Sequence, residues 1–277
     1  MISIIVPAYN ERDTLQATIN GLTHALNGKK YEIIVVDDAS NDGSIELLRS
    51  MSGITLICHE ANCGYGSSVK DGIKAASGEQ IALIDADATY PPEQINLLLG
   101  KLAGCEMVVG ARSPLPPLNR LAKTILREIV WLLTRTRVPD LNSGLRVFRK
   151  ETALRYLHLL PDGFSLTTTL TVAYLVNRHK IEYVPICYRS RGRKSKIRPI
   201  RDFLNFLLLI VRLATYFKPL EIFLPVSAIL LISGLAVGLY SLFAFHRVMD
   251  VTTIILILFS LQIALLGLLA DIIIKRR

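Results

Sequence analysis

An apolar run ends in two carboxylates in the stretch IALIDADATYPP, residues 81–92. Only Ala86 separates Asp85 from Asp87, so both side chains would leave the same face of a strand. Like charges at that spacing repel unless a cation lies beside them, and Mg²⁺ and Mn²⁺ bind carboxylate oxygens together with substrate phosphates. Aspartate is also common in turns at strand ends. The pair alone therefore indicates either a divalent-cation site or a solvated turn.

The sequence around this pair alternates strand and helix patterns. Continuous apolar runs predict buried strands at residues 2–6, 32–36, 54–58 and 81–84. Helical spacing of apolar residues occurs at residues 12–26, 44–51 and 68–76, and a further helix is expected to start at Pro91 and Pro92. This order predicts an α/β fold with an open, mainly parallel sheet. Ligands of such sheets bind beyond the carboxyl ends of the strands, where PAYNE, DDASNDGS and DADATYPP would gather.

Two patterns argue against other classes of site. The segment CGYGSSVKDG has Gly64 and Gly66 but Val69 in place of a third glycine, and it follows the third predicted strand rather than the first, so it is not a dinucleotide-binding fingerprint. Its glycines are expected to permit a tight turn into a helix. No CxxC pairing and no histidine at zinc-ligand spacing accompanies the cysteines, which are therefore expected to be reduced, mostly buried thiols: Cys58, Cys63, Cys105 and Cys187.

Two long apolar segments predict a transmembrane hairpin. Residues 222–245 contain no charged residue and residues 251–274 contain only Asp271, and about 20 residues suffice to cross a bilayer core. Basic residues flank the hairpin at RSRGRKSKIRPIR, residues 189–201, and at the terminal KRR. By the positive-inside rule both ends are expected in the cytoplasm. The opening MISIIVPAYNE has no basic n-region, so the part before the hairpin is expected to stay cytosolic.

The net charge of +9 is distributed unevenly. Residues 1–111 hold 7 basic and 14 acidic residues, whereas residues 112–218 hold 21 and 6. A basic segment before a membrane anchor suggests contact with anionic lipid headgroups or a phosphorylated substrate rather than with nucleic acid. Residues 118–138 could form a basic helix at the membrane interface or one packed on the protein core. Residues 200–217 are expected to form an interfacial helix rather than a third span.

A series of motifs resembles a known family. In chain order they are VPAYNE, VVDDASNDGS, DADATYPPE, GAR at 110–112, NSGLRVFRK at 142–150 and RGRKSK at 191–196. With these strand contexts the chain resembles membrane-anchored family 2 glycosyltransferases of the GT-A fold, in particular the polyprenyl-phosphate (dolichyl-phosphate) type. The resemblance implies inverting transfer of a sugar from a nucleotide-sugar donor to a polyprenyl phosphate, dolichyl or undecaprenyl, at the cytoplasmic membrane face. It also implies three parts: a cytosolic GT-A domain at 1–196, a juxtamembrane interfacial helix at 197–218 and a transmembrane hairpin at 219–277.

The resemblance assigns roles by position. Nucleotide-binding roles fall on Pro7, Tyr9, Glu11, Val36, Asp38, Asp85 and Ala86. Asp87 would be the direct ligand of Mg²⁺ or Mn²⁺, while Asp85 would face the ribose or a metal-bound water. Thr89 stands where some relatives place a glutamine ligand, so either its hydroxyl or a water would complete the metal shell. As a Lewis acid the cation would neutralise charge on the departing nucleoside diphosphate.

Basic residues complete the implied site. Arg112, Arg189 and Lys196 match positions that the family uses around the donor diphosphate and the acceptor phosphate. Between the last two this chain is one residue longer than the dolichyl-phosphate mannosyltransferase pattern, so Arg191 or Arg193 could take the arginine role. No catalytic base is required, because a phosphate monoester, with a second pKa of about 6, is already an anion.

Two alternatives stay open. A polysaccharide synthase shares the GT-A core, but its Gln-x-x-Arg-Trp motif is absent, since the single tryptophan, Trp131, follows REIV. A non-catalytic, membrane-tethered nucleotide-sugar-binding scaffold would not need both acids of the pair, which are intact. The sequence does not identify the donor sugar, its base or the lipid length, and the hairpins could associate into a homo-oligomer.

Overall fold

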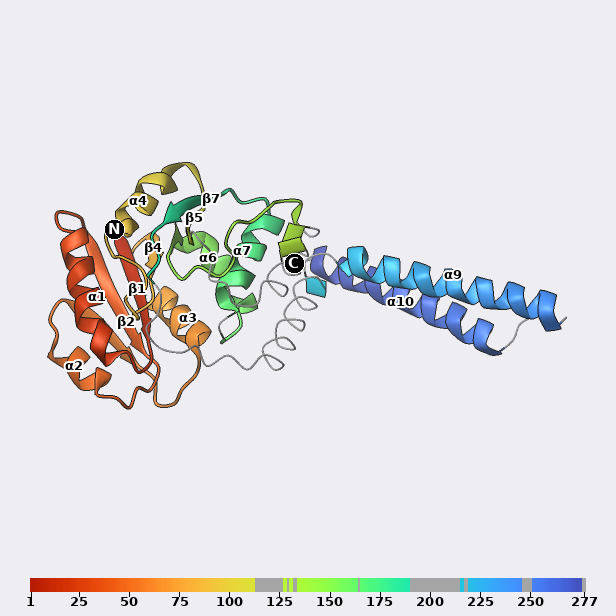
Figure 1. Cartoon of the computed structure of the whole chain (residues 1–277), viewed down its shortest axis with the longest axis horizontal. Helices are drawn as coiled ribbons and strands as arrows, with labels where there is room; N and C mark the ends of the chain where they lie inside the picture. Colours follow the sequence, from red (N-terminus) through yellow and green to blue (C-terminus); the bar gives the residue numbers. More distant parts are fainter. Residues whose placement is uncertain are drawn as a thin grey trace. The chain divides into compact units, whose positions relative to one another are not determined.

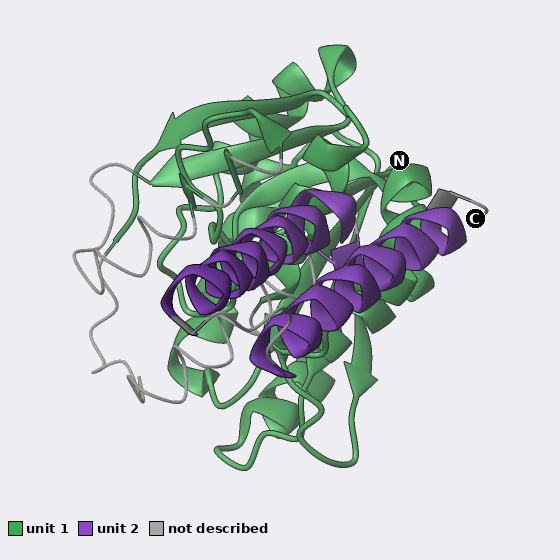
Figure 2. Ribbon diagram, turned by 90° about the vertical axis from the view of Figure 1, so that its right-hand side faces the viewer, with its two compact units in different colours: residues 1–199 green, residues 200–277 purple. Residues whose placement is uncertain are grey.

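The computed structural model describes residues 1–112, 127–128, 130–131, 134–163, 165–189, 215–216, 219–245 and 251–275. These residues belong to two compact units, residues 1–199 and residues 200–277, which are described separately (Figure 2). The predicted division at residues 197–218 falls almost entirely outside the described residues and stays a prediction. The same holds for much of the predicted basic helix at 118–138.

The first unit is built on a seven-stranded sheet with the order β3-β2-β1-β4-β6-β5-β7. Its strands are β1 Ile2–Ala8, β2 Tyr31–Asp37, β3 Ile54–Cys58, β4 Gln80–Leu83, β5 Met107–Arg112, β6 Arg146–Arg149 and β7 Ile181–Ile186. β1 runs parallel to β2 and β4, β2 to β3, and β5 to β7, whereas β6 is antiparallel to both β4 and β5. The predicted α/β class with a mainly parallel sheet is therefore confirmed. The apolar pattern had predicted only β1 to β4, and it did not anticipate β5, β6 or β7.

The reversed strand matters for the site. Because β6 runs against its neighbours, its amino end lies at the same edge of the sheet as the carboxyl ends of β4 and β5. The segment that leads into β6, residues 140–145, is thereby brought to the edge where the loops after β1, β2 and β4 emerge. A parallel strand would have placed this segment at the opposite edge.

Helices cover both faces of the sheet (Figure 1). One apolar core joins Ile4 and Val6 of β1 to α1 (Arg12–Ala25) and α4 (Gln94–Lys101). The other joins Ile5 of the same strand to α3 (Tyr65–Ala75), α6 (Lys150–Tyr156) and α7 (Leu166–Val176). Alternate residues of one strand thus enter opposite cores, which explains why the strands read as continuous apolar runs. The short helix α2 (Ser44–Ser50) follows β2.

Two helices near the site begin at other residues than predicted. α3 begins at Tyr65, three residues before the predicted start at residue 68. α4 begins only at Gln94, so the prediction that Pro91 and Pro92 open this helix is wrong by two residues. The two prolines instead form the preceding turn, in which their carbonyls accept hydrogen bonds from the N–H groups of Gln94 and Ile95, both at 3.1 Å.

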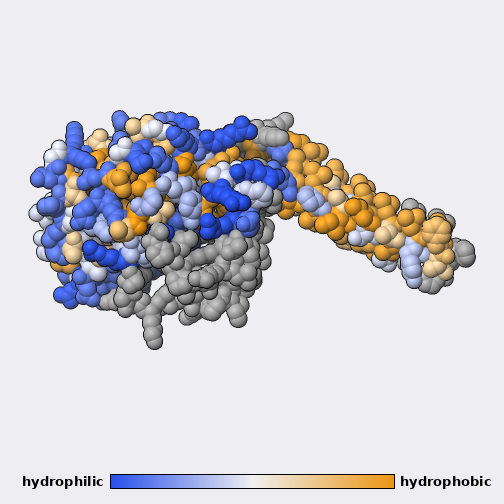
Figure 3. Space-filling model, turned by 45° about the horizontal axis from the view of Figure 1, so that its top comes forward, coloured by the Kyte–Doolittle hydropathy of each residue, from blue (hydrophilic) through white to orange (hydrophobic). Residues whose placement is uncertain are grey.

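The second unit contains two long apolar helices, α9 (Pro219–Phe245) and α10 (Val251–Lys275). Both are long and apolar enough to cross a membrane, over 26 and 24 residues. They pack against each other, and the Ser227 hydroxyl donates to the carbonyl of Ser260 at 2.9 Å. Large apolar side chains such as Phe243, 77% exposed, cover their outer surface (Figure 3). Buried core helices of a soluble protein would not show this exposure, so both helices fit the predicted membrane hairpin.

Candidate active site

The two acids lie in a turn that follows β4. This strand ends at Leu83, and the residues from Asp85 to Ala88 form a bend in which Ala88 has a φ of +56°. The expectation that both acids leave one face of a strand is therefore wrong in its geometry, because the strand ends first. The turn is fixed from α1, where the Thr14 hydroxyl donates to the carbonyl of Ala86 at 2.7 Å.

Asp85 is closely enclosed. The Tyr65 hydroxyl donates to its Oδ1 at 3.1 Å, and a Cβ at Gly144 would lie only 2.1 Å from its Oδ2. Burial and the neighbouring charge of Asp87 raise the pKa of Asp85 to about 6. Asp85 is therefore not a solvated turn residue, while binding of a cation by the pair stays a prediction. A divalent cation would offset the repulsion between the two acids.

Asp87 has its carboxylate oriented by Thr89. The hydroxyl and the N–H of Thr89 donate to Oδ1 of Asp87 at 2.6 and 3.1 Å. Thr89 itself is buried, and such outer contacts are what holds a metal-ligating carboxylate in place. The part that Thr89 plays here is to position Asp87, and direct metal ligation by its hydroxyl stays a prediction.

The predicted nucleoside residues meet at the carboxyl ends of β1 and β2. Pro7 pairs with Val36 in the sheet register, and both side chains are buried. Tyr9 is 47% exposed at the end of β1, and Glu11 is the N-cap residue of α1. The N–H of Asp38 donates to the carbonyl of Ala8 at 2.9 Å, which joins the two loops. The structure therefore brings these residues together, while their contact with a nucleoside stays a prediction.

Asp38 also holds the loop between β3 and α3. Its Oδ1 accepts from the N–H of Cys63 at 2.8 Å and lies 2.8 Å from Nδ1 of His59. Its Oδ2 accepts from the N–H of Gly64, also at 2.8 Å. His59 was not identified from the sequence, because its partner Asp38 lies 21 residues away along the chain. The expectation of mostly buried cysteines is wrong, since three of the four are exposed: Cys58, Cys63 and Cys187.

The glycines before α3 serve packing. The N–H groups of Gly66 and Ser67 donate to the carbonyl of Asp162 at 2.6 and 3.2 Å. A Cβ at Gly66 would lie 2.1 Å from the carbonyl oxygen of Pro161, and Gly64 has a φ of +94°. The first amides of α3 are thus used by the protein's own backbone, which agrees with the expected tight turn and not with a phosphate-binding fingerprint.

Arg112 is held by a carboxylate that the sequence did not reveal. Its Nε and Nη2 donate to the two carboxylate oxygens of Asp140 at 2.7 and 2.9 Å. Burial opposes the charge of both groups, but their mutual hydrogen bonds and attraction outweigh it. The pKa of Arg112 is therefore raised above its usual value, and the pKa of Asp140 is lowered below its usual value. The guanidinium also lies over the ring of Tyr188, at 5.3 Å from its centroid. Both residues are therefore charged and fixed beside the aspartate turn.

Arg146 lies fully buried beneath the segment that leads into β6. Its guanidinium donates to the carbonyls of Ser143 and Thr167, at 3.1 and 2.9 Å, and to the hydroxyl of Thr171 at 3.2 Å. Burial lowers its pKa, and no carboxylate forms an ion pair with it among the residues that the structure describes. Arg146 thereby fixes the backbone next to Gly144, the glycine that contacts Asp85.

The remaining basic residues are placed in part. The N–H of Arg189 donates to the carbonyl of Thr89 at 2.9 Å, and the residue is exposed. Lys196 and its neighbours Arg191 and Arg193 lie outside the described residues, so their phosphate-binding role stays a prediction.

Comparison with known proteins gives two family matches and several relatives. Residues 3–152 match the family described as glycosyl transferase family 2, and residues 218–275 match the GtrB C-terminal hairpin. Glycosyltransferase AglJ of Haloferax volcanii is 26% identical, over 99% of this chain and 94% of that protein. The dolichol-phosphate mannosyltransferase of Pyrococcus furiosus is 29% identical, over 71% of this chain and 59% of that protein.

A further relative and a solved structure extend the comparison. The undecaprenyl-phosphate 4-deoxy-4-formamido-L-arabinose transferase of Yersinia pestis is 34% identical. The match covers 57% of this chain and 51% of that protein. Glucosyl-3-phosphoglycerate synthase of Mycobacterium tuberculosis, solved with Mn²⁺, UDP and glucosyl-3-phosphoglycerate, superposes with a TM-score of 0.62 at 22% identity, over 78% of this chain and 79% of that one. At this identity the structural likeness supports the fold alone.

Proposed function

This chain belongs to glycosyl transferase family 2, and from that premise we propose that it transfers a sugar from a nucleotide-sugar donor to a polyprenyl phosphate at a membrane. The predicted family and GT-A fold class are both confirmed. The acceptor is inferred from two relatives whose names specify dolichol phosphate and undecaprenyl phosphate, and from the GtrB-type hairpin. We include in the proposal divalent-metal dependence, inversion at the anomeric carbon and a site on the cytoplasmic face.

The observation that carries the proposal is the enclosed aspartate turn. Asp85 and Asp87 are held at the carboxyl end of β4 by the Tyr65 and Thr89 hydroxyls. A bound cation would offset the electrostatic repulsion between the two acids. The all-oxygen donor set fits Mg²⁺ or Mn²⁺. A GT-A neighbour in the fold comparison has been solved with UDP and with either of these metals. When bound, the cation would supply charge neutralisation for the leaving diphosphate.

The chain's own residues would position both substrates around that turn. Tyr9 and Asp38 lie where the nucleoside is expected, at the ends of β1 and β2. Arg112, kept charged by Asp140, would lie beside the diphosphate, and Arg189 is exposed and hydrogen-bonded through its N–H to Thr89. In the transfer, an acceptor phosphate oxygen forms a bond to the anomeric carbon while the bond from that carbon to the donor phosphate oxygen breaks. The electron pair of the broken bond leaves with the nucleoside diphosphate. Because the acceptor oxygen would attack the anomeric carbon from the face opposite the leaving group, the configuration would invert.

No side chain needs to remove a proton in this scheme. The acceptor phosphate has a second pKa of about 6 and is an oxyanion at neutral pH. Catalysis would then rest on positioning and on electrostatic stabilisation of the leaving group. The basic flanks of the hairpin support a cytoplasmic placement, because positively charged segments next to membrane spans stay on that side.

A transfer assay with matched variants tests the proposal. Purified full-length protein in detergent is incubated with labelled nucleotide sugars and undecaprenyl or dolichyl phosphate, and lipid-linked sugar is extracted. The wild type and the exposed control Glu46→Gln are expected to form product, while Asp87→Asn is expected to lose at least 100-fold in rate. Equal activity of Asp87→Asn and the control would contradict the metal-site assignment.

The acceptor assay also separates the alternatives. Donor binding without transfer to any tested acceptor would favour the non-catalytic scaffold, and transfer to a growing sugar polymer would favour a polysaccharide synthase. Lys196→Ala is expected to raise the KM for polyprenyl phosphate more than the KM for the donor, because its ammonium would face the acceptor phosphate. An equal rise of both KM values would count against a role of Lys196 in binding the acceptor phosphate alone.

A further inference from the structure

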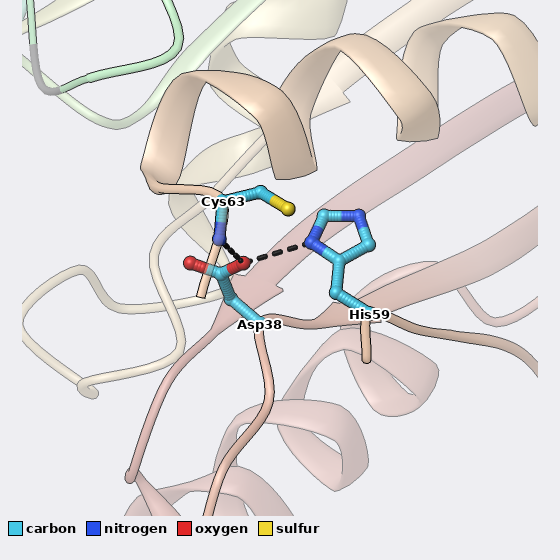
Figure 4. Close-up of side chains that lie close together, drawn as sticks. All are labelled: Asp38, His59 and Cys63. Carbon is cyan, nitrogen blue, oxygen red and sulfur yellow. Dashed lines mark hydrogen bonds and ion pairs between the residues drawn. The ribbon is translucent and has the colours of Figure 1, made fainter. Parts of the chain in front are cut away.

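A second group of metal-binding side chains lies apart from the aspartate turn. Asp38 follows β2, His59 follows β3 and Cys63 precedes α3, and one ligand atom from each lies within 4.8 Å of the other two (Figure 4). No histidine stands at a usual zinc-ligand spacing from a cysteine pair, so the sequence alone did not indicate zinc. The fold instead joins a histidine and a single cysteine of one loop to an aspartate that follows another strand.

The backbone around this group is firmly held. The N–H of His59 donates to the carbonyl of Asp37 at 2.9 Å. The N–H groups of Cys63 and Gly64 donate to the two oxygens of the Asp38 carboxylate, both at 2.8 Å. The three donors are therefore presented together by hydrogen bonds that do not depend on a metal. A ligand set arranged in advance loses less conformational freedom when a cation binds.

The imidazole of His59 lies between two carboxylates. Its Nδ1 lies 2.8 Å from Oδ1 of Asp38, and its Nε2 lies 3.3 Å from Oδ2 of Asp71 on α3. Nε2 is buried and has no hydrogen bond of good geometry among the described residues. A cation bound at Nδ1 would leave a ring proton on Nε2 alone, where it faces Asp71.

That arrangement is the one in which metal-bound histidines are usually found. The ring nitrogen opposite the metal donates to a carboxylate, which fixes the tautomer and raises the basicity of the ligand. Asp71 stands in this position, and its Oδ1 is also held by Lys74 at 2.9 Å. The side chain of His59 is 11% exposed, so its ring is fixed by packing as well.

The donor set selects a different metal from the aspartate turn. Thiolate, imidazole and carboxylate ligands suit Zn²⁺ and similar borderline cations, whereas two carboxylates suit Mg²⁺ or Mn²⁺. Three protein ligands would leave a fourth position for water. Cys63 is exposed, so a cation can reach this group from solution.

We propose that Asp38, His59 and Cys63 form a second cation site, selective for Zn²⁺ over Mg²⁺, and that its occupation opposes donor binding. Asp38 is the carboxylate expected to accept hydrogen bonds from the nucleoside. A cation on its Oδ1 would place positive charge and a water where the nucleoside would lie. The kinetic part of this proposal rests on the proposed function, whereas the binding site itself does not.

Metal binding is tested first, without any assay of transfer. Full-length protein is freed of metal with chelator and titrated in detergent with Co²⁺, which reports thiolate ligation by a charge-transfer band in the near ultraviolet. One equivalent per chain is expected, displaced by Zn²⁺ and not by excess Mg²⁺. The band is expected to persist in Asp87→Asn, which lacks the other cation site. It is expected to disappear in Cys63→Ser and to persist in Cys58→Ser, an exposed cysteine outside the group.

The outer residues give a graded test of the same site. Asp71→Asn is expected to weaken Co²⁺ binding about 10–100-fold while the band keeps its position, since an outer-shell partner is lost and no ligand is. His59→Gln is expected to bind more weakly still, with His158→Gln as its exposed control. Absence of the band in the wild type, or its survival in Cys63→Ser, would overturn the site. Thermal unfolding of each variant shows whether it folds, and Cys63→Ala replaces Cys63→Ser if that variant does not.

The kinetic consequence is measured with saturating Mg²⁺. Zn²⁺ is expected to raise the KM for the nucleotide sugar with little change in kcat, and Cys63→Ser is expected to be insensitive. Equal inhibition of the wild type and Cys63→Ser would place the Zn²⁺ effect elsewhere and overturn the regulatory part. A protein that shows the cobalt band but no transfer would contradict the proposed function and leave the cation site standing.

Discussion

Replacing Asp85 with asparagine is expected to stabilise the metal-free protein while it abolishes sugar transfer. The pKa of Asp85 is raised from 3.8 to about 6, chiefly by burial and then by the charge of Asp87. A raised pKa of an acid means that the folded state binds its proton more tightly than the unfolded state does. The folded state therefore loses stability as the pH rises from about 4 through about 6, where the acid ionises.

The magnitude follows from the size of the shift. Two pKa units correspond to about 3 kcal/mol at pH 8, and because Asp85 is partly exposed we take about 2 kcal/mol after solvent screening. Asparagine has nearly the same shape, carries no charge and still accepts the hydrogen bond from the Tyr65 hydroxyl. Removing the ionisation cost should raise the unfolding temperature by roughly 4–8 °C at pH 8.

Thermal unfolding of the full-length protein in detergent and chelator measures this difference. At pH 4.5, where most Asp85 is already protonated, the gain is expected to fall to about a third. Mg²⁺ at pH 8 should stabilise the wild type and not Asp85→Asn. The control Asp42→Asn should give no gain, because hydrogen bonds from Ser44 and Arg12 outweigh burial and keep the pKa of Asp42 below its usual value. No stabilisation by Asp85→Asn at pH 8, or an equal gain at both pH values, would refute the reasoning.

Two further substitutions test the surroundings of the turn. Gly144→Ala places a Cβ about 2 Å from the Asp85 carboxylate, so it should weaken activation by Mg²⁺ at least 10-fold. The control Gly100→Ala, whose Cβ meets nothing within 4 Å, should not change it. Unchanged metal dependence of Gly144→Ala would contradict the contact. Asp140→Asn leaves Arg112 buried without its counter-charge and should lower the free energy of unfolding by about 2–4 kcal/mol, as measured by denaturant titration. A loss below about 1 kcal/mol would show that the pair is already solvated.

The sequence was informative where local patterns decide the structure. Continuous β-branched runs marked β1 to β4, and the spacing of Asp85 and Asp87 marked the site, because both depend on residues within one segment. The exact placement of the acids was missed, since β4 ends at Leu83 and the turn geometry depends on the contact of Ala86 with α1.

The residues that sequence reasoning did not find all act through distant partners. Asp140 lies 28 residues from Arg112, and His59 lies 21 residues from Asp38, so no periodicity links them. Their pairing depends on the antiparallel insertion of β6 and on the loop between β3 and α3, which are settled by the tertiary fold. The sequence signal that could have pointed to Asp140 is its place a few residues before the NSGLRVFRK motif, at the strand that returns to the site edge.

The most direct test of the central claim is a single reaction followed with and without its metal. Wild-type protein stripped with EDTA is given a nucleotide sugar labelled in both base and sugar together with polyprenyl phosphate, and released nucleoside diphosphate and lipid-linked sugar are counted. We predict no product until Mg²⁺ or Mn²⁺ is restored, and then equal amounts of the two products with the inverted anomer. Transfer at the full rate in the presence of EDTA, or release of nucleoside diphosphate without lipid-linked sugar, would contradict the account.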